Sequence, residues 1–77
     1  MLGEDVYVMD SRLPIWEANE ILGIRLPAKE FHTLGGLVMA RLRHIPKKGE
    51  SVVEAGYRFT VEGASDRAIE KLRVEPT

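Results

Sequence analysis

The chain has 77 residues, a net charge of −1 at neutral pH and no cysteine. This length predicts one domain with a small core, and the balanced charge provides no general basic field for a nucleic-acid partner. The lack of cysteine excludes a disulfide scaffold, a zinc–thiolate site and a cysteine nucleophile. Hydrophobic residues make up 44% and charged residues 30% of the sequence, a balance typical of globular domains. No apolar run approaches the roughly 20 residues that span a bilayer.

The first elements expected along the chain are a strand and a short helix. The β-forming residues of Asp5–Met9 predict a strand with Val6 and Val8 on one face. A helix is predicted over Pro14–Leu22, because proline suits the first helical turn. Its apolar stripe at helical spacing consists of Ile15, Ala18, Ile21 and Leu22. The next segment, Ile24–His32, is expected to be a connection.

A second helix is predicted to begin after Thr33, a favourable N-cap residue, and to end at Pro46, which cannot continue it. Its apolar residues recur at helical spacing on one face, and they are Leu34, Leu37, Val38, Leu42 and Ile45. The basic residues in its last turns favour the helix dipole.

The second half of the chain predicts strands. Ser51–Glu54 and the alternating Tyr57–Glu62 indicate a hairpin, and Gly63–Asp66 indicates a turn. The last segment, Arg67–Val74, has apolar spacings that suit either a helix or a strand. We favour a strand, because it would cover the edge of the hairpin. The result is an α+β domain in the order β-α-α-β-β-β, with two helices packed on one side of a mostly antiparallel sheet.

Two adjacent glycines lie in the first turn of the second helix, where each costs roughly 0.5–1 kcal/mol relative to alanine. Free N–H groups at a helix start attract anions, so Thr33, Gly35 and Gly36 are candidates for binding the phosphate of a flavin or nucleotide. The stretch lacks both the dinucleotide-binding glycine fingerprint and the lysine of a P-loop. We therefore favour the alternative, in which the glycines let the helix start pack closely against its neighbours.

Other reactive side chains do not form a recognisable site. His32 and His44 lie twelve positions apart without clustered carboxylates, so we expect no metal site. Glu17 and Glu20 lie opposite the apolar stripe of the first helix, which indicates a solvated face. No serine or threonine has a histidine at a motif spacing. We therefore predict no catalytic residue and no metal ligand.

One basic cluster spans the last turns of the second helix and the residues after it, and provides candidate partner-binding residues. It contains Arg41, Arg43, Lys47 and Lys48, together with His44. These cations suit acidic lipid headgroups, an anionic ligand or an acidic partner domain. A solvated helix end that complements the helix dipole explains them at least as well. Trp16 is either an interface anchor or a cover for the core.

Three stretches resemble one family of domains. They are VYVMDSRLPIWEANEILGIRLP, FHTLGGLVMARLRHIPKKGESV and YRFTVEGASDRAIEKLRVEP. They are similar to the CorC/HlyC-type transporter-associated domain. The most specific part is Thr33–Gly36, followed by Ile45-Pro46 and then Gly49. Two positions depart from the pattern: His32 replaces a common acidic residue, and Ser11 replaces a common glycine.

This resemblance implies a fold, a function and a setting. It implies that the last segment is a strand, and that residues 1–77 are a single domain from the C-terminus of a longer chain. Parents of this type resemble magnesium and cobalt efflux proteins and hemolysins, in which the domain follows a pair of CBS domains, often behind a membrane-spanning part. The implied role is a non-enzymatic accessory domain that modulates ion transport from the cytoplasmic side.

The same resemblance implies partners and an alternative function. The implied partners are the CBS domains of the same parent and a second copy of the domain. The implied location is the cytoplasm, or the cytoplasmic face of the inner membrane through the parent. No cofactor is required. The fold is similar to part of FAD-binding domains, so binding of FAD or an adenine nucleotide is the alternative.

Overall fold

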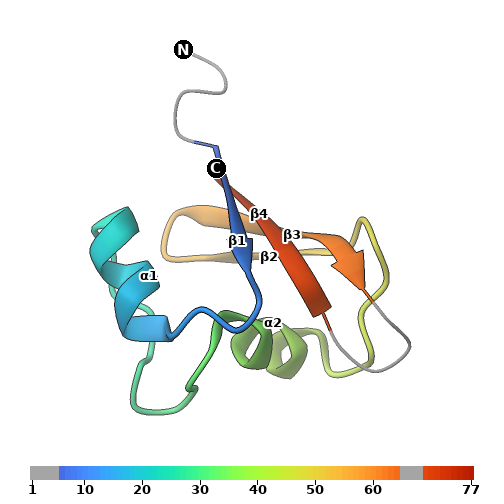
Figure 1. The fold of residues 1–77 in the computed structure, drawn as a ribbon, viewed down its shortest axis with the longest axis horizontal. Coiled ribbons are helices and arrows are strands. Elements are labelled where there is room, and N and C mark those ends of the chain that lie inside the picture. The colour runs from blue at the N-terminus through green and yellow to red at the C-terminus, as the bar shows by residue number, and fades with distance from the viewer. Residues whose placement is uncertain (1–5, 65–68) are drawn as a thin grey trace.

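A computed structural model describes residues 6–64 and 69–77 of the chain. The elements in chain order are β1 (Tyr7–Asp10), α1 (Ile15–Leu22), α2 (Leu34–Leu42), β2 (Ser51–Glu54), β3 (Tyr57–Ala64) and β4 (Ile69–Pro76). The predicted order β-α-α-β-β-β is therefore confirmed, and the domain is of the α+β class. Figure 1 shows α1 and α2 beside the twisted sheet.

The strands form one sheet in the order β1-β4-β3-β2, and each neighbouring pair is antiparallel. The C-terminal strand β4 lies between β1 and β3, so it pairs on both of its edges (Figure 1). This confirms that the ambiguous last segment contains a strand. β1 and β2 form the two edges of the sheet.

An irregularity between β3 and β4 explains why the last segment resembles a helix in sequence. Val61 pairs with Leu72 and Ala64 pairs with Ile69, with register shifts between them. Because of these shifts, Ile69 and Leu72 are both buried although they are three residues apart, which in a regular strand would place them on opposite faces. A spacing of three is the helical signal, so a β-bulge produced the ambiguity.

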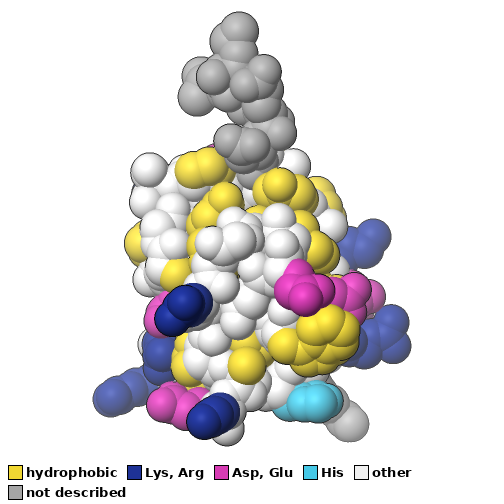
Figure 2. Space-filling model, turned by 90° about the vertical axis from the view of Figure 1, so that its left-hand side faces the viewer, with side chains coloured by type: hydrophobic (Ala, Val, Ile, Leu, Met, Phe, Trp, Pro, Cys, Tyr) yellow, Lys and Arg dark blue, Asp and Glu magenta, His cyan; other side chains and the backbone are white. Residues whose placement is uncertain are grey.

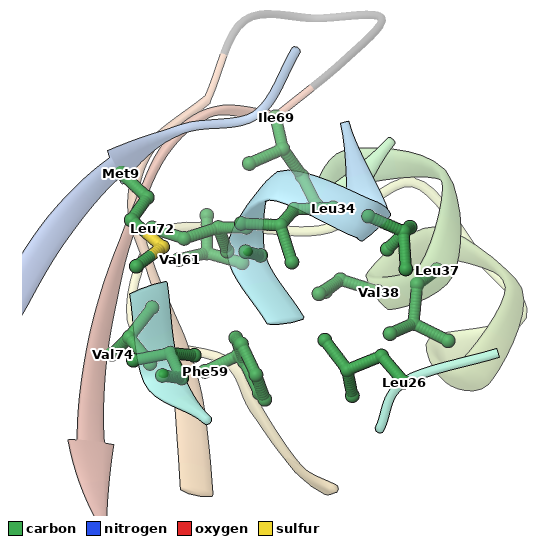
Figure 3. Close-up of a cluster of buried hydrophobic side chains, with 13 residues drawn as sticks. Met9, Leu26, Leu34, Leu37, Val38, Phe59, Val61, Ile69, Leu72 and Val74 are labelled. Atoms are coloured by element: carbon green, nitrogen blue, oxygen red, sulfur yellow. The ribbon is translucent and has the colours of Figure 1, made fainter. Parts of the chain in front are cut away.

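The core lies between the helices and one face of the sheet. Figure 3 shows Phe59 and Leu72 from the sheet pointing toward Val38 of α2 and toward Leu26 of the connection. The buried residues of this cluster are Met9, Ile15, Ala18, Leu22, Leu26, Leu34, Leu37, Val38, Phe59, Val61, Ile69, Leu72 and Val74. Burying a side chain of this size contributes about 1.5–3 kcal/mol, so the cluster is the main source of stability. Phe59 and Val61 of β3 belong to the same buried cluster as Leu37 and Val38 of α2.

Several expected boundaries and orientations differ from the structure. α2 ends at Leu42 rather than at Pro46, because Arg43 adopts a left-handed conformation (φ 63°) that stops the helix. Ile45 therefore lies beyond the helix and is 56% exposed. Ile21 is expected in the apolar stripe of α1, but it is 46% exposed, because at helical spacing it lies beside the buried face that Ile15, Ala18 and Leu22 form.

The first strand is also shifted from its predicted position. It begins at Tyr7 and includes Asp10. Val6 and Val8 are both exposed, whereas Met9 points into the core, because alternate residues of a strand face opposite sides. Strand β3 continues through Gly63 and Ala64, where a turn was predicted. The rest of that predicted turn, and residues 67–68 of the predicted last strand, lie outside the described residues.

Candidate functional site

The start of α2 is attached to the segment that precedes α1. Leu34 donates its backbone N–H to the carbonyl oxygen of Leu13 at 3.0 Å, and Gly35 donates to that of Ser11 at 2.8 Å. From the other side, Ile15 donates to the carbonyl oxygen of His32 at 3.0 Å. Two segments about 20 residues apart thus run side by side in antiparallel fashion, which positions both helix starts.

Thr33 caps α2 as the sequence predicts. Its hydroxyl oxygen accepts a hydrogen bond from the Gly36 N–H at 3.2 Å, and its own backbone is extended. The cap satisfies one of the N–H groups that a helix start leaves without a partner.

Gly35 is the glycine that close packing requires. A Cβ atom built at Gly35 would lie 3.0 Å from the Ser11 Cβ and 3.1 Å from the Ser11 carbonyl oxygen. Ser11 is itself fixed, because its hydroxyl donates to the carbonyl oxygen of Ile69 at 2.6 Å. Gly36 is exposed, and a Cβ there would meet only the Thr33 hydroxyl, at 3.3 Å. The packing prediction is therefore confirmed for Gly35 and not for Gly36.

This arrangement bears on the predicted phosphate site at Thr33, Gly35 and Gly36. The N–H groups of Leu34, Gly35 and Gly36 all donate within the chain. An anion at this helix start would have to replace one of those hydrogen bonds rather than use a free donor. Flavin or nucleotide binding by these residues stays a prediction, and the geometry adds no support for it.

Arg41, the first of the predicted partner-binding residues, is engaged inside the domain. Its guanidinium donates to both carboxylate oxygens of Glu54 on β2, at 3.0 and 3.3 Å. The same group lies over the ring of Phe31, 5.4 Å from the ring centre. The hydrogen bonds to Glu54 raise the pKa of Arg41. Arg41 thus joins α2 to the sheet.

Glu50 organises the segment that leaves α2. One carboxylate oxygen accepts the backbone N–H of Lys47 at 2.6 Å, and the other lies 2.6 Å from the ring Nε2 of His44. These two contacts, the Lys47 N–H first, lower the pKa of Glu50. We call this arrangement of His44, Lys47 and Glu50 the Glu50 clasp.

The remaining predicted partner-binding residues are exposed. Arg43, Lys47 and Lys48 all lie in the segment between α2 and β2, close together in the chain and next to the Glu50 clasp. The structure therefore divides the predicted basic cluster in two. Arg41 has a structural role, and the other three cations are presented to the surface.

Trp16 does not cover the core. It is 58% exposed on α1, and a role as an interface anchor stays a prediction. Figure 2 views the molecule from the side that carries α1 and shows hydrophobic side chains there among both acidic and basic ones.

Asn19 is an organising residue that the sequence interpretation missed. Its side-chain amide donates to the carbonyl oxygen of Leu26 at 3.1 Å and accepts the Leu26 N–H at 2.7 Å. This pair of bonds folds the connection back onto α1 and satisfies both backbone groups of a buried residue. Its signal in the sequence was the uncharged polar residue of α1, which lies next to the apolar stripe.

A hollow of about 420 Å³ lies where β1 ends and β4 begins, and it is lined by Asp10, Ser11, Arg12, Ile69, Glu70 and Lys71. Asp10 is held there by Arg12, whose guanidinium and backbone N–H both donate to its carboxylate and lower its pKa. Across residues 6–64 and 69–77, no three His, Asp or Glu side chains are grouped so that they could hold a metal ion. Neither α1 nor α2 is long and apolar enough to cross a membrane.

The fold and these features define a small α+β domain without an evident reaction centre in its described part. The chain matches the transporter associated domain family CorC_HlyC over residues 1–77. It is 34% identical over 73 residues to the magnesium and cobalt efflux protein CorC of Vibrio cholerae, covering 95% of this chain and 25% of that protein. It is 36% identical over 74 residues to hemolysin C of Brachyspira hyodysenteriae, covering 94% and 27%. The chain therefore belongs to the CorC_HlyC family, and it spans about a quarter of the length of these relatives.

Solved structures share the whole fold. The transporter associated domain CorC_HlyC from Nitrosomonas europaea is 28% identical with a TM-score of 0.87, covering 100% of this chain and 93% of that one. The corresponding domain of a Xylella fastidiosa hemolysin, in complex with Mg²⁺ and Mn²⁺, is 29% identical with a TM-score of 0.86, covering 97% and 91%. The transporter associated domain of a CBS domain protein from Porphyromonas gingivalis is 22% identical with a TM-score of 0.83, covering 97% and 92%, and shares the fold.

Proposed function

We propose that this domain is a non-enzymatic accessory part of a longer ion-transport protein of the magnesium and cobalt efflux type. It modulates transport through contacts with other parts of that protein, including CBS domains, from the cytoplasmic side. The observation that carries the proposal is the family match over the whole chain, combined with relatives that are about four times longer.

The arrangement of the described side chains supports a contact role rather than a catalytic one. Three hydrogen-bonded polar side chains, Ser11, Asn19 and Arg41, each join two parts of the domain. Groups that serve the fold in this way are not available to a substrate. The cations Arg43, Lys47 and Lys48 are exposed and lie together on one segment, so they are available for contact with an anionic partner.

The test is an association measurement between the 77-residue domain and the remaining part of its parent, including its CBS pair. Isothermal calorimetry in the presence and absence of Mg²⁺ also separates association from binding of the ion by the domain itself. We expect association with a Kd in the micromolar range. No association up to high micromolar concentration, with both parts folded, would count against the accessory role.

A further inference from the structure

The segment between α2 and β2 combines exposed cations with one exposed apolar side chain. We call residues 43–48, which follow α2, the 43–48 loop. Arg43, Lys47 and Lys48 are exposed, and Ile45, which lies among them, is 56% exposed. A basic segment with an apolar residue at its centre has the two components that bind membrane interfaces.

Contacts at both ends fix the backbone of this loop. At its start, the N–H of Arg43 donates to the carbonyl oxygen of Met39 at 2.9 Å, which closes the helix. At its end, the Glu50 clasp accepts the Lys47 N–H, and Pro46 is buried. Because Pro46 points inward, its neighbour Ile45 is held outward. The loop thus presents its side chains without a further ordering step.

The loop also lies in a region of surplus positive charge, although the whole chain has a net charge of −1. Residues 41–54 contain four Lys and Arg and only two carboxylates. Glu54 is paired with Arg41, and Glu50 contacts His44 and the Lys47 N–H. The acidic groups of this region are therefore engaged at its base, whereas Arg43, Lys47 and Lys48 extend into solvent. This polarity favours an anionic partner.

We propose that the 43–48 loop docks on an anionic bilayer surface. Arg43, Lys47 and Lys48 meet the headgroups, and Ile45 enters the boundary between headgroups and acyl chains. This inference rests on the accessory function proposed above, because that function places the domain in a longer ion-transport protein. It names an anionic bilayer as the partner of Arg43, Lys47 and Lys48. Vesicle binding can fail while association with the rest of the longer protein succeeds, and the reverse, so the two proposals are distinguishable.

A lipid surface fits this loop better than an acidic protein does. Stable protein interfaces bury at least about 1,000 Å² around a packed aromatic or aliphatic centre. The loop provides a single exposed apolar side chain, no Phe, Tyr or Trp, and long flexible cations. On a bilayer each basic side chain near the surface acts almost independently and raises the binding constant roughly fivefold. Such binding requires no shaped complement.

The experiment is sedimentation of the 77-residue domain with large vesicles at low salt. One set contains phosphatidylcholine alone, and the other includes roughly 30% phosphatidylglycerol. We expect binding to the anionic vesicles only, weakening as salt screens the charges. The double variant Lys47→Gln/Lys48→Gln should bind about 25-fold more weakly, and Ile45→Ser roughly threefold to tenfold more weakly.

The matched control is Arg25→Gln/Lys29→Gln, which removes the same charge from exposed positions on the connection between the helices. Equal weakening by this control would overturn the proposal, because binding would then follow net charge alone. No anionic-vesicle binding, or binding unaffected by Ile45→Ser, would also overturn it. Binding of the domain to polyglutamate but not to anionic vesicles would overturn it as well, because the cations would then serve an acidic protein partner. Circular dichroism of each variant confirms that it is folded.

Discussion

The backbone N–H of Gly35 donates to the carbonyl oxygen of Ser11 at 2.8 Å, and the two residues approach so closely that a Cβ atom on Gly35 would lie 3.0 Å from the Ser11 Cβ. The contact attaches the start of α2 to the segment that leads from β1 into α1. It lies next to β4 as well, because the Ser11 hydroxyl donates to Ile69. One glycine thus sets the distance between α2 and the sheet.

We therefore expect Gly35→Ala to destabilise the domain by about 1–2 kcal/mol, because the new methyl group meets a fixed backbone. Its gain in helix propensity, roughly 0.5–1 kcal/mol, offsets only part of the loss. Gly36→Ala is the control, since that position is exposed and the same gain applies. Urea unfolding followed by Trp16 fluorescence measures both. Equal stability of the two variants would contradict the packing account.

Asn19→Ala should destabilise the domain by about 1–3 kcal/mol, because it leaves both backbone groups of the buried Leu26 without a partner. The stability of Asn19→Asp should lie between that of Asn19→Ala and that of the unchanged domain, since aspartate keeps the acceptor and loses the donor. Glu20→Ala, at an exposed position of the same helix, controls for helix propensity. A free energy of unfolding for Asn19→Ala within roughly 0.5 kcal/mol of the control would show that the hydrogen bonds between Asn19 and Leu26 are dispensable.

The Glu50 clasp should make part of the stability depend on pH. The pKa of Glu50 is lower in the folded domain than in the unfolded chain, so its contribution is complete above the ordinary glutamate pKa of about 4.3 and is lost as the pH falls through the lower folded value. Glu50→Gln should therefore be less stable than the parent sequence at neutral pH, and the difference should shrink between about pH 5 and pH 3.

Urea unfolding at a series of pH values tests the clasp, with Glu20→Gln as the control. Asp10 has a lowered pKa as well and loses its stabilisation in the same acidic range. Only the difference in stability between Glu50→Gln and the unchanged domain therefore isolates the contribution of Glu50. A difference that does not change with pH would show that the Glu50 contacts do not stabilise the fold.

Titration with FAD or ADP tests the helix-start prediction. We expect no saturable change in the amide NMR signals of residues 33–37 up to millimolar ligand, because the N–H groups of Leu34, Gly35 and Gly36 already donate within the chain. A saturable shift confined to these residues would contradict this expectation and restore the phosphate site at Thr33, Gly35 and Gly36.

Several features of this protein follow from the sequence by itself. The order of the first five elements, the Thr33 cap and the Ser51–Glu54 strand all depend on local signals: side-chain periodicity, capping chemistry and turn residues. The resemblance to the CorC_HlyC family is likewise visible in three stretches of the sequence, of which Thr33–Gly36 with the Ile45-Pro46 that follows is the most specific, and the family match over residues 1–77 confirms it. Signals of this kind act over a few residues, so a sequence displays them directly.

Only the tertiary structure decided which of two similar residues contacts a distant segment and which is exposed. The sequence treats Gly35 and Gly36 alike, but Ser11 contacts one and leaves the other exposed. It treats Arg41 and Arg43 alike, but Glu54 and Phe31 engage the first, and a left-handed backbone presents the second to solvent. It gives Ile69 and Leu72 a helical spacing, which the bulge between β3 and β4 turns into one buried strand face. These outcomes depend on contacts between residues far apart in the chain, and such contacts exist only once the chain has folded.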